Sequence, residues 1–231
     1  MQGYRRAAHL LRTAPARAHR RRATLAGMPG AWDDSRRAFA DATAWFVRTT
    51  TVVGDRWGRP GLGEWDVRAL VGHTSRSLLT VEAYLGRPAG SVGIRSAADY
   101  VRATRAVAAG PEVAARGRQA GVALGPDPAA AVAEIAARVV PLVDTRDGTE
   151  LLTTVAGGMR LADYLPTRTF ELAVHTADLA TALGLPLEVP AAAAAQALRL
   201  VADLAVAEGR AGPLLLAATG RRELPAGWSV L

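Results

Sequence analysis

The residues whose types and spacing best fit chemistry lie in the segment TRTFELAVHTADLATALG, residues 167–184. Glu171 and His175 are four residues apart, so on a helix their side chains lie one above the other, roughly 6 Å apart along the axis. A carboxylate and an imidazole in that arrangement can chelate one metal ion. The same pattern also fits a solvent-facing stripe in which Arg168 and Glu171 form a surface ion pair. The spacing alone favours this second interpretation, because a single Glu-x-x-x-His pattern has many accidental matches.

The other histidine after residue 27 is His73, in the segment EWDVRALVGHTSRSLL. We predict that it lies beside the apolar stripe of its helix, on a flank shared with Leu70, Ser77 and Tyr84. Histidines in such positions are more often hydrogen-bonded boundary residues than metal ligands. The residue type by itself therefore leaves both roles open.

Two residue types are missing from the chain. Cysteine is absent, which excludes disulfides, thiolate metal ligands, iron–sulfur clusters and a cysteine nucleophile. Lysine is absent as well, which excludes a Schiff base, and no P-loop, G-x-S-x-G or G-x-G-x-x-G pattern occurs. Any sulfur chemistry must therefore use a thiol supplied from outside the protein.

The positive charge is concentrated at the N-terminus. The net charge is +7, and residues 1–27 contain seven arginines and no acid, so the remainder is formally neutral. The Arg5-Arg6 pair fits a twin-arginine signal, but further arginines interrupt every apolar stretch that follows it, and no later stretch approaches the roughly 18 apolar residues of a membrane span. We expect a cytoplasmic protein without membrane or nucleic-acid partners. The leader is then a disordered basic tail or a spurious extension before Met28, and a basic arm that touches nucleic acid or lipid is a less favoured alternative.

Hydrophobic periodicity predicts a mainly helical chain. Helices are expected at about residues 33–53, 67–85, 96–120 and 128–143, from between 163 and 166 to 183, and at about 191–208. The third is weakened by Gly110-Pro111, and Asp66 is the expected cap of the second. Residues 54–65 are too rich in glycine and proline to be regular. Residues 151–161 predict a small β-hairpin or an ordered loop, and the tail after residue 212 predicts a final hairpin. This pattern favours a helical bundle with a minor β element.

Two segments of the sequence resemble those of a known family. The segments WDVRALVGH, residues 65–73, and RTFELAVHTADLATALG, residues 168–184, are similar to the paired motifs of the mycothiol-dependent maleylpyruvate isomerase family, in the DinB-like superfamily. The similarity covers most of residues 31–231 and is specific at the two motifs. It implies a mainly α fold, with a DinB-like four-helix bundle that binds a metal over residues 28–186. A C-terminal helix and a short β-hairpin over residues 187–231 would pack on the bundle.

The family's first-motif histidine and second-motif glutamate and histidine bind a divalent ion, commonly zinc. The resemblance therefore implies His73, Glu171 and His175 as metal ligands. Two imidazoles and a carboxylate suit zinc and leave an open position, as in catalytic sites, where an incoming thiol can ionise.

The implied function is a metal-dependent, thiol-cofactor-dependent isomerase or transferase. It would act on small electrophilic substrates, with mycothiol or a similar thiol as cofactor and the metal-bound thiolate as nucleophile. The alternative is a non-catalytic metal-binding or regulatory bundle of the same fold. We expect a monomer or a homodimer.

Two residues are predicted to support catalysis. Asp178 can orient His175 as a hydrogen-bond acceptor, or it can be an ordinary exposed acid. Arg168 can bind a substrate carboxylate through two parallel hydrogen bonds, although an ion pair with Glu171 is the favoured expectation. Because the family's isomerases use an arginine from the C-terminal part, three further arginines are candidate anion-binding residues: Arg160, Arg221 and Arg222.

Overall fold

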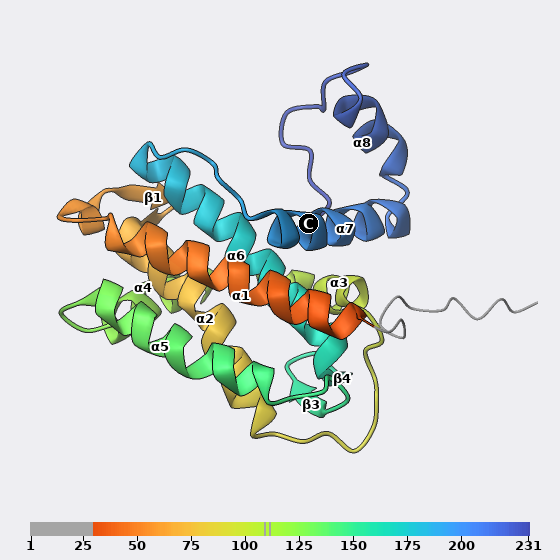
Figure 1. The fold of residues 1–231 in the computed structure, drawn as a ribbon. Coiled ribbons are helices and arrows are strands. Elements are labelled where there is room, and N and C mark those ends of the chain that lie inside the picture. The colour runs from red at the N-terminus through yellow and green to blue at the C-terminus, as the bar shows by residue number, and fades with distance from the viewer. Residues whose placement is uncertain (1–29, 109, 111) are drawn as a thin grey trace, which may run out of the picture.

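The computed structural model describes residues 30–108, 110 and 112–231 and shows a mainly helical protein (Figure 1). The helices are α1 (Ala31–Thr51), the short 3₁₀ helix η2 (Arg56–Gly58), α2 (Val67–Leu85), α3 (Ala97–Ala108), α4 (Glu112–Ala123), α5 (Pro128–Asp144), α6 (Leu161–Leu183), α7 (Ala191–Ala207) and α8 (Ala211–Ala218). The strands are β1 (Pro60–Leu62), β2 (Trp65–Asp66), β3 (Leu151–Thr154) and β4 (Gly157–Arg160). The leader, residues 1–27, lies outside the described residues.

The centre of the molecule is a bundle of four long helices, α1, α2, α5 and α6, which pack side by side (Figure 1). Buried apolar residues at helical spacing join them, among them Phe39 of α1, Leu70 of α2, Val139 of α5 and Leu172 of α6, none of which is exposed. Burial of such side chains stabilises each helix against its neighbours. The predicted helical bundle is confirmed.

Helix α2 begins where the sequence predicts. Asp66 is its N-cap, and the side chain accepts a hydrogen bond of 2.7 Å from the backbone N–H of Ala69. Such a cap satisfies one of the free N–H groups of the first turn. The capping aspartate therefore sets where α2 starts, and thus which of its residues face the bundle.

Helix α6 lies at the centre of the fold, in contact with α1, α2, α3 and α7. It runs from its N-cap, Arg160, to Gly184, whose left-handed backbone (φ 68°) ends the helix, as expected for a C-terminal glycine. Most of its residues are buried. The helices around α6 therefore restrict the few polar side chains of α6 that reach the surface.

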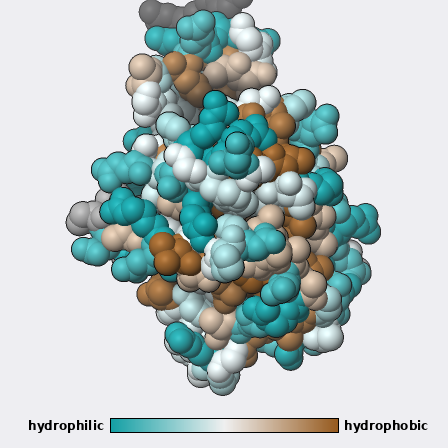
Figure 2. Space-filling model, turned by 90° about the vertical axis from the view of Figure 1, so that its left-hand side faces the viewer, coloured by the Kyte–Doolittle hydropathy of each residue, from teal (hydrophilic) through white to brown (hydrophobic). Residues whose placement is uncertain are grey.

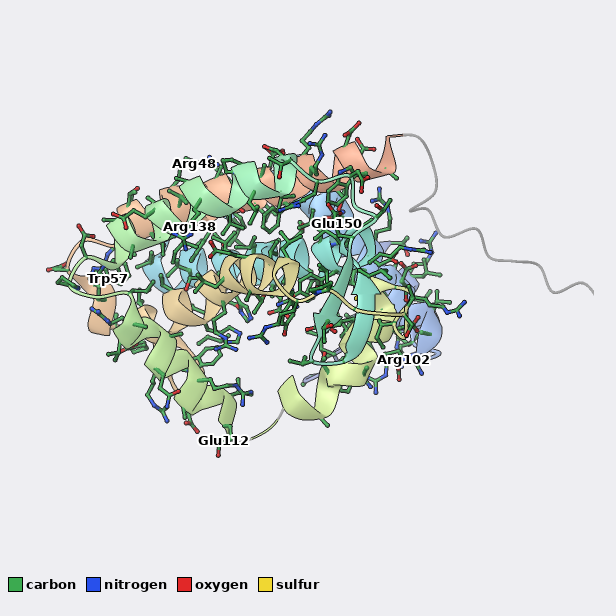
Figure 3. All side chains as sticks on the ribbon, turned by 90° about the horizontal axis from the view of Figure 1, so that it is seen from below. Arg48, Trp57, Arg102, Glu112, Arg138 and Glu150 are labelled. Carbon is green, nitrogen blue, oxygen red and sulfur yellow. The ribbon has the colours of Figure 1, made fainter. Side chains whose placement is uncertain are left out.

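The expected third helix is two helices. α3 ends at Ala108 and α4 begins at Glu112, because the Gly-Pro pair at 110 and 111 offers a flexible residue and one without a backbone N–H. α4 packs closely on α2, and a Cβ atom on Gly72 would come within 2.1 Å of the backbone nitrogen of Gly121. Figure 3 shows the other end of α4, with Glu112, directed away from the bundle.

Two small hairpins lie at opposite ends of the bundle (Figure 1). Strands β3 and β4 pair antiparallel from Leu151 opposite Arg160 to Thr154 opposite Gly157, so that of the hairpin or ordered loop predicted at residues 151–161 the hairpin is present. The prediction that residues 54–65 are irregular was wrong in part, since they include η2, β1 and the first residue of β2. The backbone there is regular because β1 and β2 bond to each other and the segment rests on α2 and α6.

The prediction of a hairpin within residues 187–231 was also wrong. Residues 187–231 form α7 and α8 and contain no strand. In α8, Pro213 sits in the first turn, where a missing N–H is harmless, and the following Leu-Leu-Leu-Ala-Ala consists of strong helix formers without β-branched residues. α8 packs on α7 and stands apart from the bundle (Figure 1).

The surface is mixed in polarity. On the face shown in Figure 2, hydrophobic residues form separate patches among hydrophilic ones. Among the residues that the structure describes, no helix has both the length and the apolar character needed to span a bilayer.

Candidate metal centre

Three side chains of types that can bind a metal ion meet where α2 packs on α6. His73 comes from α2, and Glu171 and His175 come from successive turns of α6. One potential ligand atom from each lies within 4.8 Å of the others. All three are half-buried, so they are held in place and still reachable. The structure therefore brings together the three residues that the family resemblance implies.

The two α6 residues are linked through a third. Nε2 of His175 lies 3.2 Å from Oε2 of Glu171, and Nδ1 of the same ring lies 3.0 Å from Oδ2 of Asp178. Asp178 is one turn beyond His175, so helical spacing alone aligns the three groups. With Asp178 accepting from Nδ1–H, Nε2 is the ring atom that faces Glu171.

Charge reinforces this arrangement. Burial by itself lowers the pKa of His175, but hydrogen bonds to Asp178 and Glu171, together with their negative charges, raise it to about 9. Burial by itself raises the pKa of Glu171, but the bond to His175 and the positive charges of Arg168 and His175 bring it to about 2. The pair is therefore charged at neutral pH, and a cation bound to Nε2 would take the place of a proton.

His73 has the opposite character. Its burial, and then the positive charge of His175, lower its pKa to about 4, with smaller contributions from Arg76 and Arg168. The ring is thus neutral at pH 7, which is the form that ligates metals. Its Nδ1 atom is buried and has no hydrogen-bond partner. An orphaned nitrogen of this kind calls for an explanation, and metal ligation is one.

Trp65 is a neighbour that sequence reasoning did not connect with the site. Its ring is stacked on the imidazole of His73, with centroids 4.4 Å apart and planes inclined by 32°. It also approaches His175 edge-on at 6.5 Å. The sequence predicts core or loop anchoring for Trp65, and the available signal was its place just before the Asp66 cap, a position that often packs back on the helix.

Arg168 does not form the expected ion pair with Glu171. Instead, its guanidinium lies over the rings of Tyr164, at 5.1 Å, and Tyr100, at 5.6 Å, and Nε donates to Oγ1 of Thr167. Aromatic faces attract a cation, and they hold this one beside Glu171 without neutralising it. No carboxylate of the described residues pairs with Arg168.

The other candidate arginines are not at this centre. Arg160 is the N-cap of α6, eleven residues before Glu171, or roughly 16 Å along the helix. Arg221 and Arg222 are exposed and follow α8, which packs on α7. The prediction that one of them binds a substrate anion is not supported by any contact with the three metal-binding side chains in the part of the chain that the structure describes.

One comparison with known proteins gives a match. The family model described as the mycothiol maleylpyruvate isomerase N-terminal domain matches residues 58–180. The match spans more than half of the chain and includes all three candidate ligands and Asp178. Searches of curated proteins and of solved structures gave no match.

Proposed function

The chain belongs to the mycothiol maleylpyruvate isomerase N-terminal domain family, and from this premise we propose that it is a metal-dependent enzyme that uses mycothiol or a similar small thiol. Its substrates would be small electrophiles, which it would isomerise or join to the thiol. The observation that carries the proposal is the meeting of His73, Glu171 and His175 within 4.8 Å. The first of these comes from a different helix, about a hundred residues away in sequence.

The residues present fit a divalent cation, most simply zinc. Two imidazole nitrogens and a carboxylate oxygen are ligands that zinc prefers, and three protein ligands leave room for a further one. The buried, unpartnered Nδ1 of His73 supports ligation by this ring, because a buried polar atom left without a partner costs about 1–3 kcal/mol. A divalent cation bound here would act as a Lewis acid that lowers the pKa of an incoming thiol.

The chain's own side chains would prepare that position. Asp178 accepts a hydrogen bond from Nδ1–H of His175, so that Nε2, on the side of Glu171, is the atom at which a cation would replace a proton. Glu171 supplies negative charge, because its pKa of about 2 keeps it ionised at any physiological pH. Neutral His73 completes the set without adding a positive charge.

Arg168 is the proposed anchor for a carboxylate on the substrate. Tyr100 and Tyr164 hold its guanidinium one turn of α6 from Glu171, and its charge is not neutralised by an ion pair. A guanidinium binds a carboxylate through two parallel hydrogen bonds. An anionic electrophile bound in this way would lie beside the candidate metal ligands.

The thiol must come from solution, because the chain contains no cysteine. Addition of the thiol sulfur to an activated double bond would leave a carbon–carbon single bond that can rotate. Elimination of the thiol then restores the double bond in the other geometry, and the substrate is isomerised. If the carbon next to the activating group instead takes up the proton that the thiol lost, the product is a thioether and the reaction is a transfer.

The test is an activity screen of purified, zinc-loaded protein against electrophiles with activated double bonds, each with and without mycothiol. We expect turnover that needs both zinc and the thiol and that is lost in Glu171→Ala. Asp203→Ala, which removes an exposed acid on α7, is the matched control and should keep it. Zinc binding without thiol-dependent turnover of any electrophile would contradict the enzyme and favour the non-catalytic metal-binding bundle.

A further inference from the structure

The two histidines of the metal centre are held in different ways. Metal-ligating histidines usually have their second ring nitrogen fixed by a hydrogen bond, which orients the ring. His175 has such a bond, from Nδ1 to Asp178. For His73, no residue of the described chain donates to or accepts from the ring, and Nδ1 is buried. No hydrogen bond within the described part of the chain therefore sets the orientation of His73.

The contact that can do so is the indole of Trp65. It packs face to face with the His73 ring, tilted by 32°, at a centroid distance of 4.4 Å, close to the lower limit of about 4.5 Å for favourable aromatic pairs. It also forms an edge-to-face pair with the ring of His175, with centroids 6.5 Å apart. The indole is buried, with an exposed fraction of 8%, so it presents a fixed flat surface to the imidazole.

The indole is itself fixed by helix α4. Its Nε1–H donates a 3.0 Å hydrogen bond to the carbonyl of Ala114. The ring lies directly against Gly117, where a Cβ atom would come within 2.5 Å of it. Helix α4 is in turn tied to the start of α2, because the guanidinium of Arg68 donates to the carbonyls of Gly121 and Gly125.

We propose that Trp65 is a positioning residue of the metal centre, which holds the His73 ring in the orientation needed to join Glu171 and His175. The identity of His73 as a metal ligand rests on the proposed function. The ring contact takes the place of the hydrogen bond that His175 donates to Asp178. Helix α4 thereby becomes a supporting part of the centre, although it contributes none of the three candidate ligands.

The test compares zinc affinity in three variants by competition with a chromophoric chelator. Trp65→Leu removes the flat ring, and Trp65→Phe keeps a ring face but loses the N–H. The matched control is Trp32→Leu, because Trp32 also donates Nε1–H to a backbone carbonyl, that of Arg146, and also packs on a glycine, Gly148. Thermal unfolding of each variant separates lost stability from lost binding.

We expect Trp65→Leu to weaken zinc binding by about tenfold, the lower end of the effects seen for residues that orient metal ligands. Trp65→Phe should restore most of the affinity, and Trp32→Leu should bind as wild type does even if it unfolds at a lower temperature. If Trp65→Leu does not fold, Gly117→Ala displaces the same ring from the side of α4 and should weaken binding as well. Wild-type affinity in Trp65→Leu or in Gly117→Ala would overturn the proposal.

Nuclear magnetic resonance of the metal-free protein separates this proposal from the proposed function. The His73 ring should give one sharp set of signals, with an Overhauser contact to the Trp65 indole. These signals should broaden or split in Trp65→Leu but not in Trp32→Leu. If wild type binds no zinc but shows this pattern, the proposed function fails while the positioning by Trp65 stands. Unchanged His73 signals in Trp65→Leu would overturn the positioning.

Discussion

Nδ1 of His175 lies 3.0 Å from Oδ2 of Asp178, while Nε2 of the same ring lies 3.2 Å from Glu171. One imidazole therefore sits between two carboxylates, each about one turn away on α6. Asp178 is on the side away from Glu171, so it can orient the ring without competing for the ligand position. This division of roles gives the first prediction.

Asp178→Asn should weaken zinc binding by about 10- to 100-fold, as loss of an acceptor behind a metal-bound histidine generally does. The amide keeps the size of the side chain but loses the negative charge that makes the imidazole a better ligand. Chelator competition measures the affinity, and Asp203→Asn, on the exposed face of α7, serves as the control. Equal affinities for the two variants would refute the role of Asp178.

Arg168→Gln should raise the KM for a carboxylate-bearing electrophile by about 10- to 100-fold, since a hydrogen bond to a charged group contributes about 1.5–3 kcal/mol. The methyl ester of the same substrate should show little change, because it lacks the charge. Zinc content should stay at the wild-type level. Arg160→Gln, exposed at the start of the same helix, controls for general loss of positive charge, and an equal effect on acid and ester would argue against carboxylate binding.

Gly72→Ala should lower the free energy of unfolding by about 1–3 kcal/mol or more, the usual effect of overpacking. Its Cβ would lie 2.1 Å from the backbone nitrogen of Gly121, and backbone cannot yield as a flexible side chain does. Chemical denaturation gives the value. The comparison is Gly90→Ala, where a Cβ meets nothing within 4 Å, and it should be nearly neutral. If both variants are equally stable, helices α2 and α4 are not in close contact.

The stability of the protein should depend on pH through Asp163. Burial raises the pKa of this carboxyl above its ordinary value of 3.8, although its position in the first turn of α6 favours the charge. A folded-state pKa above the unfolded one means that ionisation destabilises the fold. The penalty is absent below pH 3.8, grows as the pH rises from 3.8 to the raised pKa, and is complete above it.

Asp163→Asn should therefore be more stable than wild type at pH 7, with the difference shrinking as the pH falls towards 3. Urea unfolding at several pH values measures this, with Asp203→Asn as an exposed control that should show no such trend. A wild type that is the more stable of the two at neutral pH would mean that charge at the helix start outweighs burial.

The α6 half of the site could be read from the sequence, because helical periodicity alone places Glu171, His175 and Asp178 on one face. Periodicity could not predict that His73 lies beside that face, because the packing of α2 on α6 depends on contacts between residues distant in sequence. The resemblance to the family's paired motifs supplied that link. Trp65 was missed as a neighbour of the site because its position depends on α4, whose packing no local pattern encodes.

The errors in the predicted fold have similar causes. The tail after residue 212 contains short apolar runs that fit either a strand or a helix. The run that forms α8 is too short for hydrophobic periodicity to distinguish a helix from a strand. The Gly-Pro pair at 110 and 111 was read as a weak point within one helix, whereas two helices form on either side of it. Arg168 was expected to pair with Glu171, but two tyrosines from different parts of the chain hold it.

The central claim, that His73, Glu171 and His175 share one cation, is tested most directly by elemental analysis of purified protein. Wild type should contain about one zinc per chain, and His73→Ala and His175→Ala should each contain almost none while keeping the helical circular dichroism of wild type. Asp203→Ala should retain the metal. Full zinc content in His73→Ala, or no metal in wild type even after zinc is added, would contradict the claim.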